Sequence, residues 1–410
     1  MSASVDNSGM PNPRKFLIIG VASLLACLVG FFIPGQERVA AFSYLIGIIF
    51  TSSIAVGMLF MVMIHHIFDA QWSVIVRRQA ENYLSVMPWL GVMFLPLFLI
   101  TYLWDQGAVW LWMNEDAPLG HGHGTVGEDV LYLKKTWWLS ETFFWIRAIL
   151  CFGVWAFFAR AFRKHSFSQD EDGSPEHTKA CRKLAAAGLF SVAFTWSAAA
   201  FDWIMALEYH WFSTMFGVWF FANAMRAALA VMLLTCAFLV AKGPLKGIFN
   251  TKHLHDVATL CFAFTVFWAY ISFSQYFLIW NGNIPEETFW FNFREEGAWW
   301  YVSMVLVFGH FLFPFLFMLQ WPLKTSYKAM TFMASWILLM QLLDLFFNIL
   351  PSLKDHGHVF QMFYNPVHFI WYITGVVGGL GVLLWAYWSS FRQRKIIPIR
   401  APRIGECRHP

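Results

Sequence analysis

Asp344, together with Gln341 and Asn348, interrupts a long run of otherwise apolar residues. The i, i+3 and i+7 spacing places the three side chains on one face of a helix. An ionisable side chain inside such a run is costly to bury, so it usually faces a partner or water and marks a functional site. A carboxyl group in that position can take up and release a proton. Asp344 is therefore the best single candidate for a proton relay.

Two arginines lie in other apolar runs, and each needs a partner. We expect Arg226 near the middle of its run, at the depth of Asp344. Arg147 and Asp202 share a second depth, on runs that follow one another in the chain, and Glu141 marks the entrance to the run of Arg147. Two interpretations stay open. Either these pairs only fix helix packing, or the arginine tunes a carboxyl group that loads and unloads protons.

Histidine and glutamine supply the remaining candidates. His65, His66 and Asp69 follow one another at the end of the second apolar run. Imidazoles beside a carboxylate could admit protons there, and the alternative is docking to a neighbouring subunit. His310 is expected in the middle of the eighth run and Gln275 in the second half of the seventh. A hydrogen-bonded core residue and a proton carrier are the two interpretations of His310.

The same residue types form no pattern typical of a metal or haem centre. The cysteines have no C-x-x-C spacing, so we expect no thiolate-bound zinc, iron–sulfur cluster or covalently attached haem. Histidines on separate apolar runs do not share a depth, which disfavours a haem with two axial histidines. His121 and His123 belong to an HGHG stretch that is more simply a glycine-rich loop than a metal site. The six cysteines are Cys27, Cys151, Cys181, Cys236, Cys261 and Cys407.

The elements that must position these residues are ten apolar runs close to the roughly 20 residues that span a bilayer. The chain has 410 residues, of which 59% are hydrophobic and only 13% charged, too few charges for a water-facing surface of this size. Backbone groups in lipid must bond within their own segment, so the runs are expected to be helices. The predicted spans are Phe16–Ile33, Val39–Phe68, Ser85–Leu103, Thr142–Ala159, Leu184–Ala206, Thr214–Ala241, Val257–Trp280, Trp299–Leu319, Ala329–Ile349 and Pro366–Trp388.

Lysine and arginine are distributed unevenly around these runs. Of the 28, 21 lie in one set of flanking segments, five in the opposite set and two inside runs. Basic residues concentrate on the cytoplasmic side, so both termini are predicted to be cytoplasmic, and the net charge of +4 does not indicate nucleic-acid binding. We divide the chain into a cytoplasmic segment (1–15), a transmembrane domain (16–388) and a basic tail (389–410). The polar segment Arg160–Lys183 is expected to be a flexible connector.

Several strings resemble those of one family. They are DAQWSVIVRRQAE (Asp69–Glu81), FDWIMALEYHWFSTMFGVWFF (Phe201–Phe221), FWAYISFSQYFLIWNGNIPEET (Phe267–Thr288) and GHFLFPFLFML (Gly309–Leu319). The sequence is similar to the second quinol-oxidase-type membrane subunit, the ActF type, of alternative complex III, a bacterial quinol:electron-acceptor oxidoreductase. That family is related to NrfD/PsrC membrane proteins. The resemblance covers roughly Lys15–Trp388.

The resemblance implies two four-helix bundles, about residues 39–206 and 214–349, flanked by the first and last helices. It implies a complex in the bacterial inner (cytoplasmic) membrane that passes electrons from quinol to cytochrome c or a terminal oxidase. Its c-type haems and iron–sulfur clusters belong to partner subunits, namely c-type cytochromes and an iron–sulfur protein. The quinol site belongs to a paralogous membrane subunit. This chain is then expected to bind no redox cofactor directly, while a bound quinone or phospholipid stays open.

These observations lead to three hypotheses about function. The first is an accessory subunit that contributes proton half-paths to the complex. The second is a structural scaffold in which the buried pairs only hold helices together. The third, a stand-alone secondary transporter, predicts matching Gly or Pro breaks in two halves of the chain. Pro314 and the glycines of the tenth run have no such counterparts, which disfavours the transporter. Those glycines are Gly375, Gly378, Gly379 and Gly381.

Overall fold

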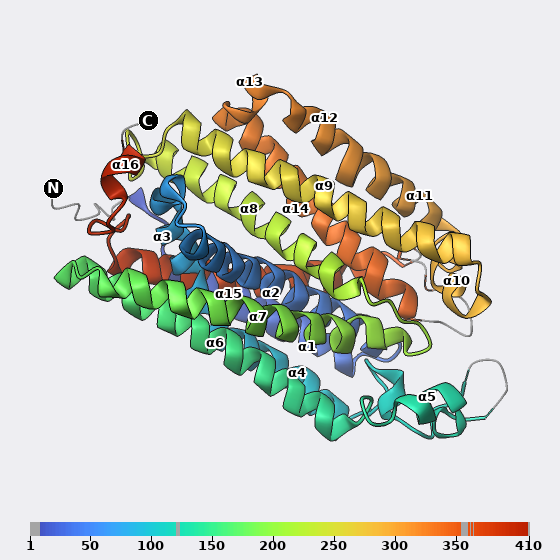
Figure 1. The fold of residues 1–410 in the computed structure, drawn as a ribbon. Coiled ribbons are helices and arrows are strands. Elements are labelled where there is room, and N and C mark those ends of the chain that lie inside the picture. Colours follow the sequence, from blue (N-terminus) through green and yellow to red (C-terminus); the bar gives the residue numbers. More distant parts are fainter. Residues whose placement is uncertain (1–8, 120–123, 354–359, 361, 364, 409–410) are drawn as a thin grey trace.

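The computed structural model describes residues 9–119, 124–353, 360, 362–363 and 365–408. In these ranges the secondary structure is helical, and extended pairing is limited to one isolated bridge between Pro118 and Thr125. Ten helical segments of the described chain are long and apolar enough to cross a membrane. They run side by side along one direction (Figure 1). The predicted all-α membrane fold is therefore confirmed.

Each predicted apolar run corresponds to one helical span, with ends shifted by a few residues to more than a turn. The spans are formed by α1 (Pro13–Val29), α2 (Glu37–Ile67), α3 (Val74–Tyr83) with α4 (Met87–Leu103), α6 (Glu141–Asp172), α7 (Glu176–Trp203), α8 (Phe216–Lys242), α9 (Thr251–Gly282), α11 (Ala298–Val305) with α12 (Phe313–Leu319), α14 (Tyr327–Ile349) and α15 (His368–Gln393). The short helices are α5 (Val130–Lys135), α10 (Pro285–Asn292), α13 (Trp321–Lys324) and α16 (Ile404–Arg408).

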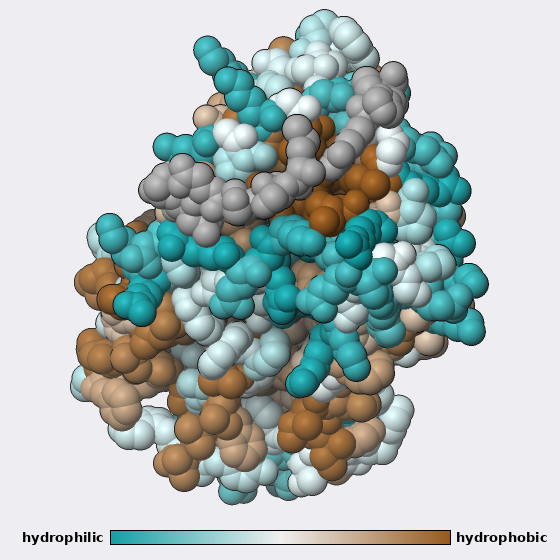
Figure 2. All heavy atoms as spheres, turned by 90° about the vertical axis from the view of Figure 1, so that its left-hand side faces the viewer, coloured by the Kyte–Doolittle hydropathy of each residue, from teal (hydrophilic) through white to brown (hydrophobic). Residues whose placement is uncertain are grey.

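The two ends of the molecule differ in what they carry. One end, here called the terminal face, holds both ends of the chain and α16 (Figure 1). The opposite end, the loop face, holds α5 and α10. Hydrophilic side chains spread across the middle of the terminal face (Figure 2). Between the two ends, large apolar side chains such as Ile149, Phe194 and Phe273 are exposed. A belt of this kind suits contact with lipid.

Two helices form the centre of the molecule. α2 is buried along its whole apolar window and packs against α4, α6 and α7. α8 packs against α9 and α14, and α12 packs against α9. The two groups of helices meet mainly where α2 crosses α8. α1 and α15 lie outside both groups, with α15 packed between α1 and α2.

Glycines let α15 approach its neighbours closely. A Cβ at Gly47 of α2 would lie 2.1 Å from the Gly375 carbonyl oxygen, and one at Gly20 of α1 would lie 2.8 Å from the Val382 amide nitrogen. Small residues at such crossings allow backbones to pack directly in a membrane protein. The glycines of the tenth span therefore serve helix packing, within an α15 that is continuous from His368 to Gln393.

The prediction of a flexible connector at Arg160–Lys183 is wrong. α6 continues to Asp172 and α7 begins at Glu176, which leaves a turn of three residues. Gly173 ends α6 with a left-handed φ of 73°, a conformation that glycine adopts without strain. The polar extension is ordered because Asp170 bonds to Arg78 of α3, with 2.7 Å between the carboxylate oxygen and Nη1. Tertiary contacts of this kind override a polar composition.

Candidate functional site

Arg147 of α6 and Asp202 of α7 form a buried ion pair near the loop face. Arg147 Nε lies 2.6 Å from Asp202 Oδ2, and Nη2 lies 2.9 Å from Oδ1. Trp138 Nε1 donates a third hydrogen bond to Oδ1 at 2.9 Å. The predicted contact between Arg147 and Asp202 is confirmed. A bidentate pair of this geometry is among the strongest side-chain contacts, and it fixes α6 against α7.

Aromatic rings close the pair off from its surroundings. The Arg147 guanidinium lies 4.1 Å from the centre of the Trp138 ring and 4.3 Å from that of Phe143. Glu141, the expected entrance residue, lies at the first position of α6. The described contacts do not join it to the pair, and its buried Oε1 has no hydrogen-bond partner. Asp202 is therefore held in place and shielded, whereas Glu141 is not.

Asp344 has a different environment in the middle of the second group of helices. Its Oδ2 accepts hydrogen bonds from Asn223 Nδ2 at 3.1 Å and from Trp268 Nε1 at 3.3 Å. Its Oδ1 lies 3.2 Å from Asn348 Nδ2. The predicted polar face of α14 is thus buried, with Gln341 also inside. All three donors to the Asp344 carboxyl group are neutral.

The prediction that Arg226 pairs with Asp344 is wrong. In the described part of the chain the two side chains form no ion pair within 4.0 Å. Arg226 Nη2 instead donates to the backbone carbonyl of His310, and its guanidinium lies 5.6 Å from the centre of the Trp268 ring. His310 lies in a π-helical segment, Leu306–Leu312, whose altered bonding offers this carbonyl. A backbone oxygen and an aromatic face therefore replace the expected carboxylate.

The ring nitrogens of His310 accept and donate no hydrogen bond within the described part of the chain. The side chain is fully buried. The ring contacts the edge of Trp268 at 4.2 Å between centres. Gln341 also has no partner for its amide nitrogen or oxygen, and neither do Nε and Nη1 of Arg226. Buried polar atoms without protein partners usually bind ordered water. This cluster therefore has the properties of a hydrated site.

A cavity of about 680 Å³ is lined by Asp344 and extends to α10 at the loop face. It lies between α9, α10, the π-helical segment and α14, and its walls are mainly aromatic and aliphatic. Asp344 and Asn348 lie on one side of it, with Gln275 on another. Gln275 accepts a hydrogen bond from Ser213 at 2.9 Å. The cavity therefore brings Gln275 near Asp344, a grouping that the sequence does not indicate.

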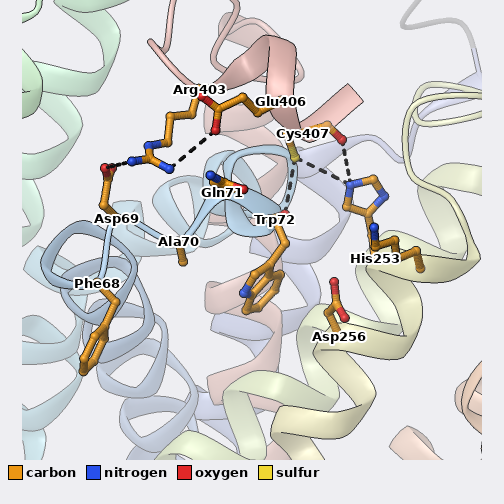
Figure 3. Close-up of a pocket in the computed structure, with 11 residues that line it drawn as sticks. Phe68, Asp69, Ala70, Gln71, Trp72, His253, Asp256, Arg403, Glu406 and Cys407 are labelled. Atoms are coloured by element: carbon orange, nitrogen blue, oxygen red, sulfur yellow. Dashed lines mark hydrogen bonds and ion pairs between the residues drawn. The ribbon is translucent and has the colours of Figure 1, made fainter. Parts of the chain in front are cut away.

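His65 and His66 lie buried at the end of α2 near the terminal face. Neither ring nitrogen of His65 has a partner, and its ring meets the edge of Trp72 at 5.2 Å. The ring of His66 stacks on Phe162 at 5.7 Å. Asp69 lies nearby, but its carboxylate oxygen Oδ2 pairs with Arg182 at 2.6 Å and with Arg403 at 2.7 Å (Figure 3). The three predicted residues are thus brought together in space without forming one hydrogen-bonded cluster.

Sequence reasoning missed an ion-pair network next to these histidines. Arg78 Nε lies 3.0 Å from Glu81 Oε2 and Arg78 Nη1 lies 2.7 Å from Asp170 Oδ2. Ser166 donates to Glu81 at 2.6 Å. The segment that carries Arg78 and Glu81 lies between two of the predicted spans, and it forms the buried helix α3. The i, i+3 spacing of Arg78 and Glu81 is the signal that could have indicated a helix.

Arg294 is a second residue that the sequence does not single out. It is buried, and its three guanidinium nitrogens donate to the carbonyls of Trp290, Phe347 and Asn348 at 2.7 to 2.9 Å. Two of these carbonyls belong to the last turn of α14, where a cation is favoured by the helix dipole. Arg294 therefore closes the end of α14 just beyond Asp344.

The loop face carries a cluster of polar side chains around Asp129. Asp129 Oδ2 lies 2.7 Å from the Tyr209 hydroxyl, which donates to it, and 2.5 Å from His210 Nε2. Lys135 Nζ donates to the Tyr209 carbonyl at 2.6 Å. These contacts attach the α5 segment to the end of α7, which fixes the long loop before α6.

His210 and Asp129 shift each other's pKa through their direct contact. Burial acts to lower the pKa of His210, but its contacts with Glu208 and Asp129 outweigh burial and raise that pKa above its ordinary value. Burial acts to raise the pKa of Asp129, but hydrogen bonds from Tyr209, the Leu131 amide and His210 hold it below its ordinary value. Both shifts favour the ionised forms, so the contact between His210 and Asp129 stabilises the ion pair in the folded protein.

Comparison with known proteins adds no relative. No family model matches the chain, and no curated protein matches it. The described residues contain no group of three or more His, Cys, Asp or Glu side chains placed to hold a metal ion. The HGHG stretch considered above as a metal site lies largely outside the described residues, which omit 120–123.

Proposed function

We propose that this chain is a membrane subunit of a respiratory quinol-oxidising complex in the bacterial inner membrane, and that it contributes proton half-paths to that complex. The ActF-type resemblance of the four sequence strings supports the assignment to alternative complex III. The ten-span helical fold with buried ionisable residues is compatible with it. The asymmetry of lysine and arginine supports a cytoplasmic terminal face and a loop face on the opposite side.

The environment of Asp344 is the observation that carries this proposal. Its carboxyl group is buried, accepts its bonds in the described part of the chain from neutral donors, and lines a cavity that extends to α10 at the loop face. A carboxyl group in such surroundings can change its protonation state without breaking an ion pair. His310 and Gln341, with unpartnered polar atoms, provide places for water near it. We therefore assign the loop-face half-path to Asp344.

A second half-path begins at the terminal face. His65 and His66 lie buried behind that surface, and His65 lines a cavity there together with Asp69 and the exposed Arg182. Imidazole exchanges protons near neutral pH more readily than any other side chain. We assign the cytoplasmic entrance to this group. Arg226 of α8 bonds to the His310 carbonyl and lies over the Trp268 ring, and Trp268 in turn donates to Asp344. The fixed positive charge of Arg226 can therefore influence Asp344.

The proposal places the redox cofactors on partner subunits, so electrons do not pass through this chain. Quinol would be oxidised in a paralogous membrane subunit, and the iron–sulfur protein and c-type cytochromes would carry electrons to cytochrome c or a terminal oxidase. The chain's own part is proton conduction and stability of the assembly, with lipid around it. A bound quinone or phospholipid in the 680 Å³ cavity would be compatible with its apolar walls.

Substitution of Asp344 by asparagine tests the proposal. The variant keeps the size of the side chain and can still accept hydrogen bonds from Asn223 and Trp268 through its amide oxygen. Its amide nitrogen cannot accept the bond from Asn348, and the exchangeable carboxyl group is lost. We expect the reconstituted complex to assemble normally and to show a lower ratio of protons translocated to electrons transferred. Asp116→Asn, an exposed loop-face substitution, is the matched control and should leave the ratio unchanged. An unchanged ratio in Asp344→Asn would refute the role of Asp344.

The closed Arg147–Asp202 pair favours a second candidate, a purely structural scaffold. Its bidentate geometry and aromatic cover need no proton transfer to explain them. If the whole chain is a scaffold, Asp202→Asn and Asp344→Asn both lower the yield of assembled complex. The complex that remains would then have the wild-type proton-to-electron ratio. Measuring yield and ratio on the same preparation separates the two functions.

A further inference from the structure

The exposed face of α6 changes from apolar to basic along its length. Ile149 and Phe157 are 73% and 60% exposed, and a Cβ at Gly153 between them would meet nothing within 4 Å. The next exposed positions of this face, toward the terminal face, are Arg160 and Lys164. These positions recur every three or four residues, so they form one stripe on the helix, here called the α6 stripe. The α6 stripe therefore passes from lipid-facing side chains to positive charges.

Two arginines beside the basic end of this stripe lie against one aromatic ring. The guanidinium groups of Arg163 and Arg394 lie 5.5 and 4.4 Å from the centre of the Phe167 ring. Arg163 belongs to α6, whereas Arg394 directly follows α15. Arg163 Nη2 also donates to Ser390 Oγ of α15 at 3.0 Å, which joins the terminal ends of the two helices. Two helices that are far apart in the sequence therefore bring their positive charges together.

These side chains form a group, here called the basic cluster, that consists of Arg160, Arg163, Lys164 and Arg394. In the part of the chain that the structure describes, none of the four forms an ion pair within 4.0 Å. The carboxylates that pack in this region, Glu81 and Asp170, are already paired with Arg78 at 3.0 and 2.7 Å. Like charges held close together repel one another unless an anion lies between them. The basic cluster therefore has the charge and the free donors to bind an anion.

Neighbouring helices place the basic cluster at the boundary of the membrane. α4 packs beside α6 (Figure 1), and a Cβ at Gly91 would lie 3.5 Å from the Cβ of Phe152. Trp89, on the first turn of α4, is 43% exposed and meets Trp385 of α15 edge to face, with 5.0 Å between ring centres. Exposed tryptophans concentrate where hydrocarbon meets the lipid head groups. Arg160 follows Phe152 by about two turns of α6, so it lies on the terminal side of Trp89, at the depth of the head groups.

We propose that the basic cluster binds the head group of an anionic phospholipid, whose acyl chains lie along the apolar part of the α6 stripe. The guanidinium groups of Arg163 and Arg394 donate to the phosphate oxygens, and Arg160 and Lys164 add positive charge beside them. A dissolved phosphate ion would meet the same cations but would leave the apolar part of the stripe uncovered. An anionic lipid fits both parts, and basic residues at the cytoplasmic end of a span attract such lipids. The lipid site goes beyond the proposed proton conduction, and its test needs no measurement of activity.

Native mass spectrometry of the full-length chain in detergent measures the affinity for individual lipids. With matched acyl chains, we expect phosphatidylglycerol to bind about ten-fold more tightly than zwitterionic phosphatidylcholine. Arg394→Gln should weaken phosphatidylglycerol binding about five-fold, which corresponds to the roughly 1 kcal/mol expected for one basic residue beside anionic lipid. Arg160→Gln should act in the same direction. Lys246→Gln is the matched control, because it removes an exposed charge between α8 and α9, outside the basic cluster, and it should leave the affinity unchanged.

Soluble anions separate the contribution of the head group from that of the acyl chains. Glycerophosphoglycerol and inorganic phosphate carry the charge without the chains, so neither should displace phosphatidylglycerol when present at the same concentration as the lipid. Displacement by either of them would indicate a site for a free anion and would overturn the proposal. Equal binding of the two lipids, or an equal loss of affinity in Lys246→Gln, would overturn it as well. So would an unchanged affinity in the double variant Arg160→Gln/Arg394→Gln, whose thermal unfolding, measured alongside, checks that the fold is kept.

Discussion

Replacing Gly47 by alanine tests how closely α2 and α15 must pack. The added Cβ would lie 2.1 Å from the Gly375 carbonyl oxygen, whereas real Cβ contacts are essentially never below 3.0 Å. The two helices would have to separate locally by about 0.9 Å, the difference between these distances. Overpacking of this kind costs about 1–3 kcal/mol. The better helix propensity of alanine offsets at most about 1 kcal/mol of that. With the full offset, we expect a net loss of about 0–2 kcal/mol, which is about 1–3 kcal/mol relative to a glycine-to-alanine change in a helix without the clash.

Thermal and denaturant unfolding of the purified protein in detergent would measure this loss. Gly153→Ala is the matched control, because Gly153 also lies inside a helix, α6, but a Cβ there meets nothing within 4 Å. The control should be neutral or slightly stabilising. If Gly47→Ala were as stable as Gly153→Ala, the close approach of α2 and α15 would be wrong, and with it the account of the α15 glycines.

Three further predictions concern other buried or clustered groups. Asp202→Asn leaves Arg147 buried without its anionic partner, so we expect a loss of about 3–5 kcal/mol in the free energy of unfolding. The pKa of His210 is raised in the folded protein, so its bond to Asp129 stabilises the α5 segment fully below the ordinary His pKa of 6.5 and is lost as pH rises through the raised value. The protection factors of residues 124–135, which are corrected for the base-catalysed intrinsic exchange rate, should fall on that alkaline side relative to those of the α6 interior. A fall only on the acid side would contradict the assignment. Arg294→Met removes three hydrogen bonds to backbone carbonyls, and we expect faster exchange in the last turn of α14 but not at its start.

Much of the architecture follows from local sequence properties. Ten apolar runs of spanning length are sufficient to predict ten helices, because a backbone in lipid has few alternatives. The Arg147–Asp202 contact is also predictable. The two residues lie at equal depth on consecutive antiparallel helices, and a buried arginine needs an anion. The depth of a residue in the membrane and the order of the helices can both be deduced from positions along the chain.

The remaining contacts depend on groups that spacing does not reveal. Arg226 bonds to the backbone carbonyl of His310, which a local change from α- to π-helix provides. The extension of α6 depends on Asp170 meeting Arg78, from a segment about 90 positions earlier in the chain. The fold-back of the carboxy-terminal segment depends on Gln79 bonding to Ile396. Partners supplied by backbone atoms or by distant segments leave no periodic pattern in a single sequence.

In the proposal, the buried residues Asp202 and Asp344 have different roles, one in each group of helices. Asp202 is tied to a cation by two short bonds, so taking up a proton would require breaking that pair inside the membrane. Asp344 has only neutral donors, and a cavity reaches it. The loop-face half-path of the proposal therefore belongs to the second group of helices, although the histidine entrance belongs to the first. The two half-paths then meet across the contacts between the two groups, of which the α2–α8 crossing is the main one. There Gly57 packs directly on the backbone of Ala224, the residue after Asn223, which donates to Asp344. A proton path that stayed within one group of helices would not join the two half-paths.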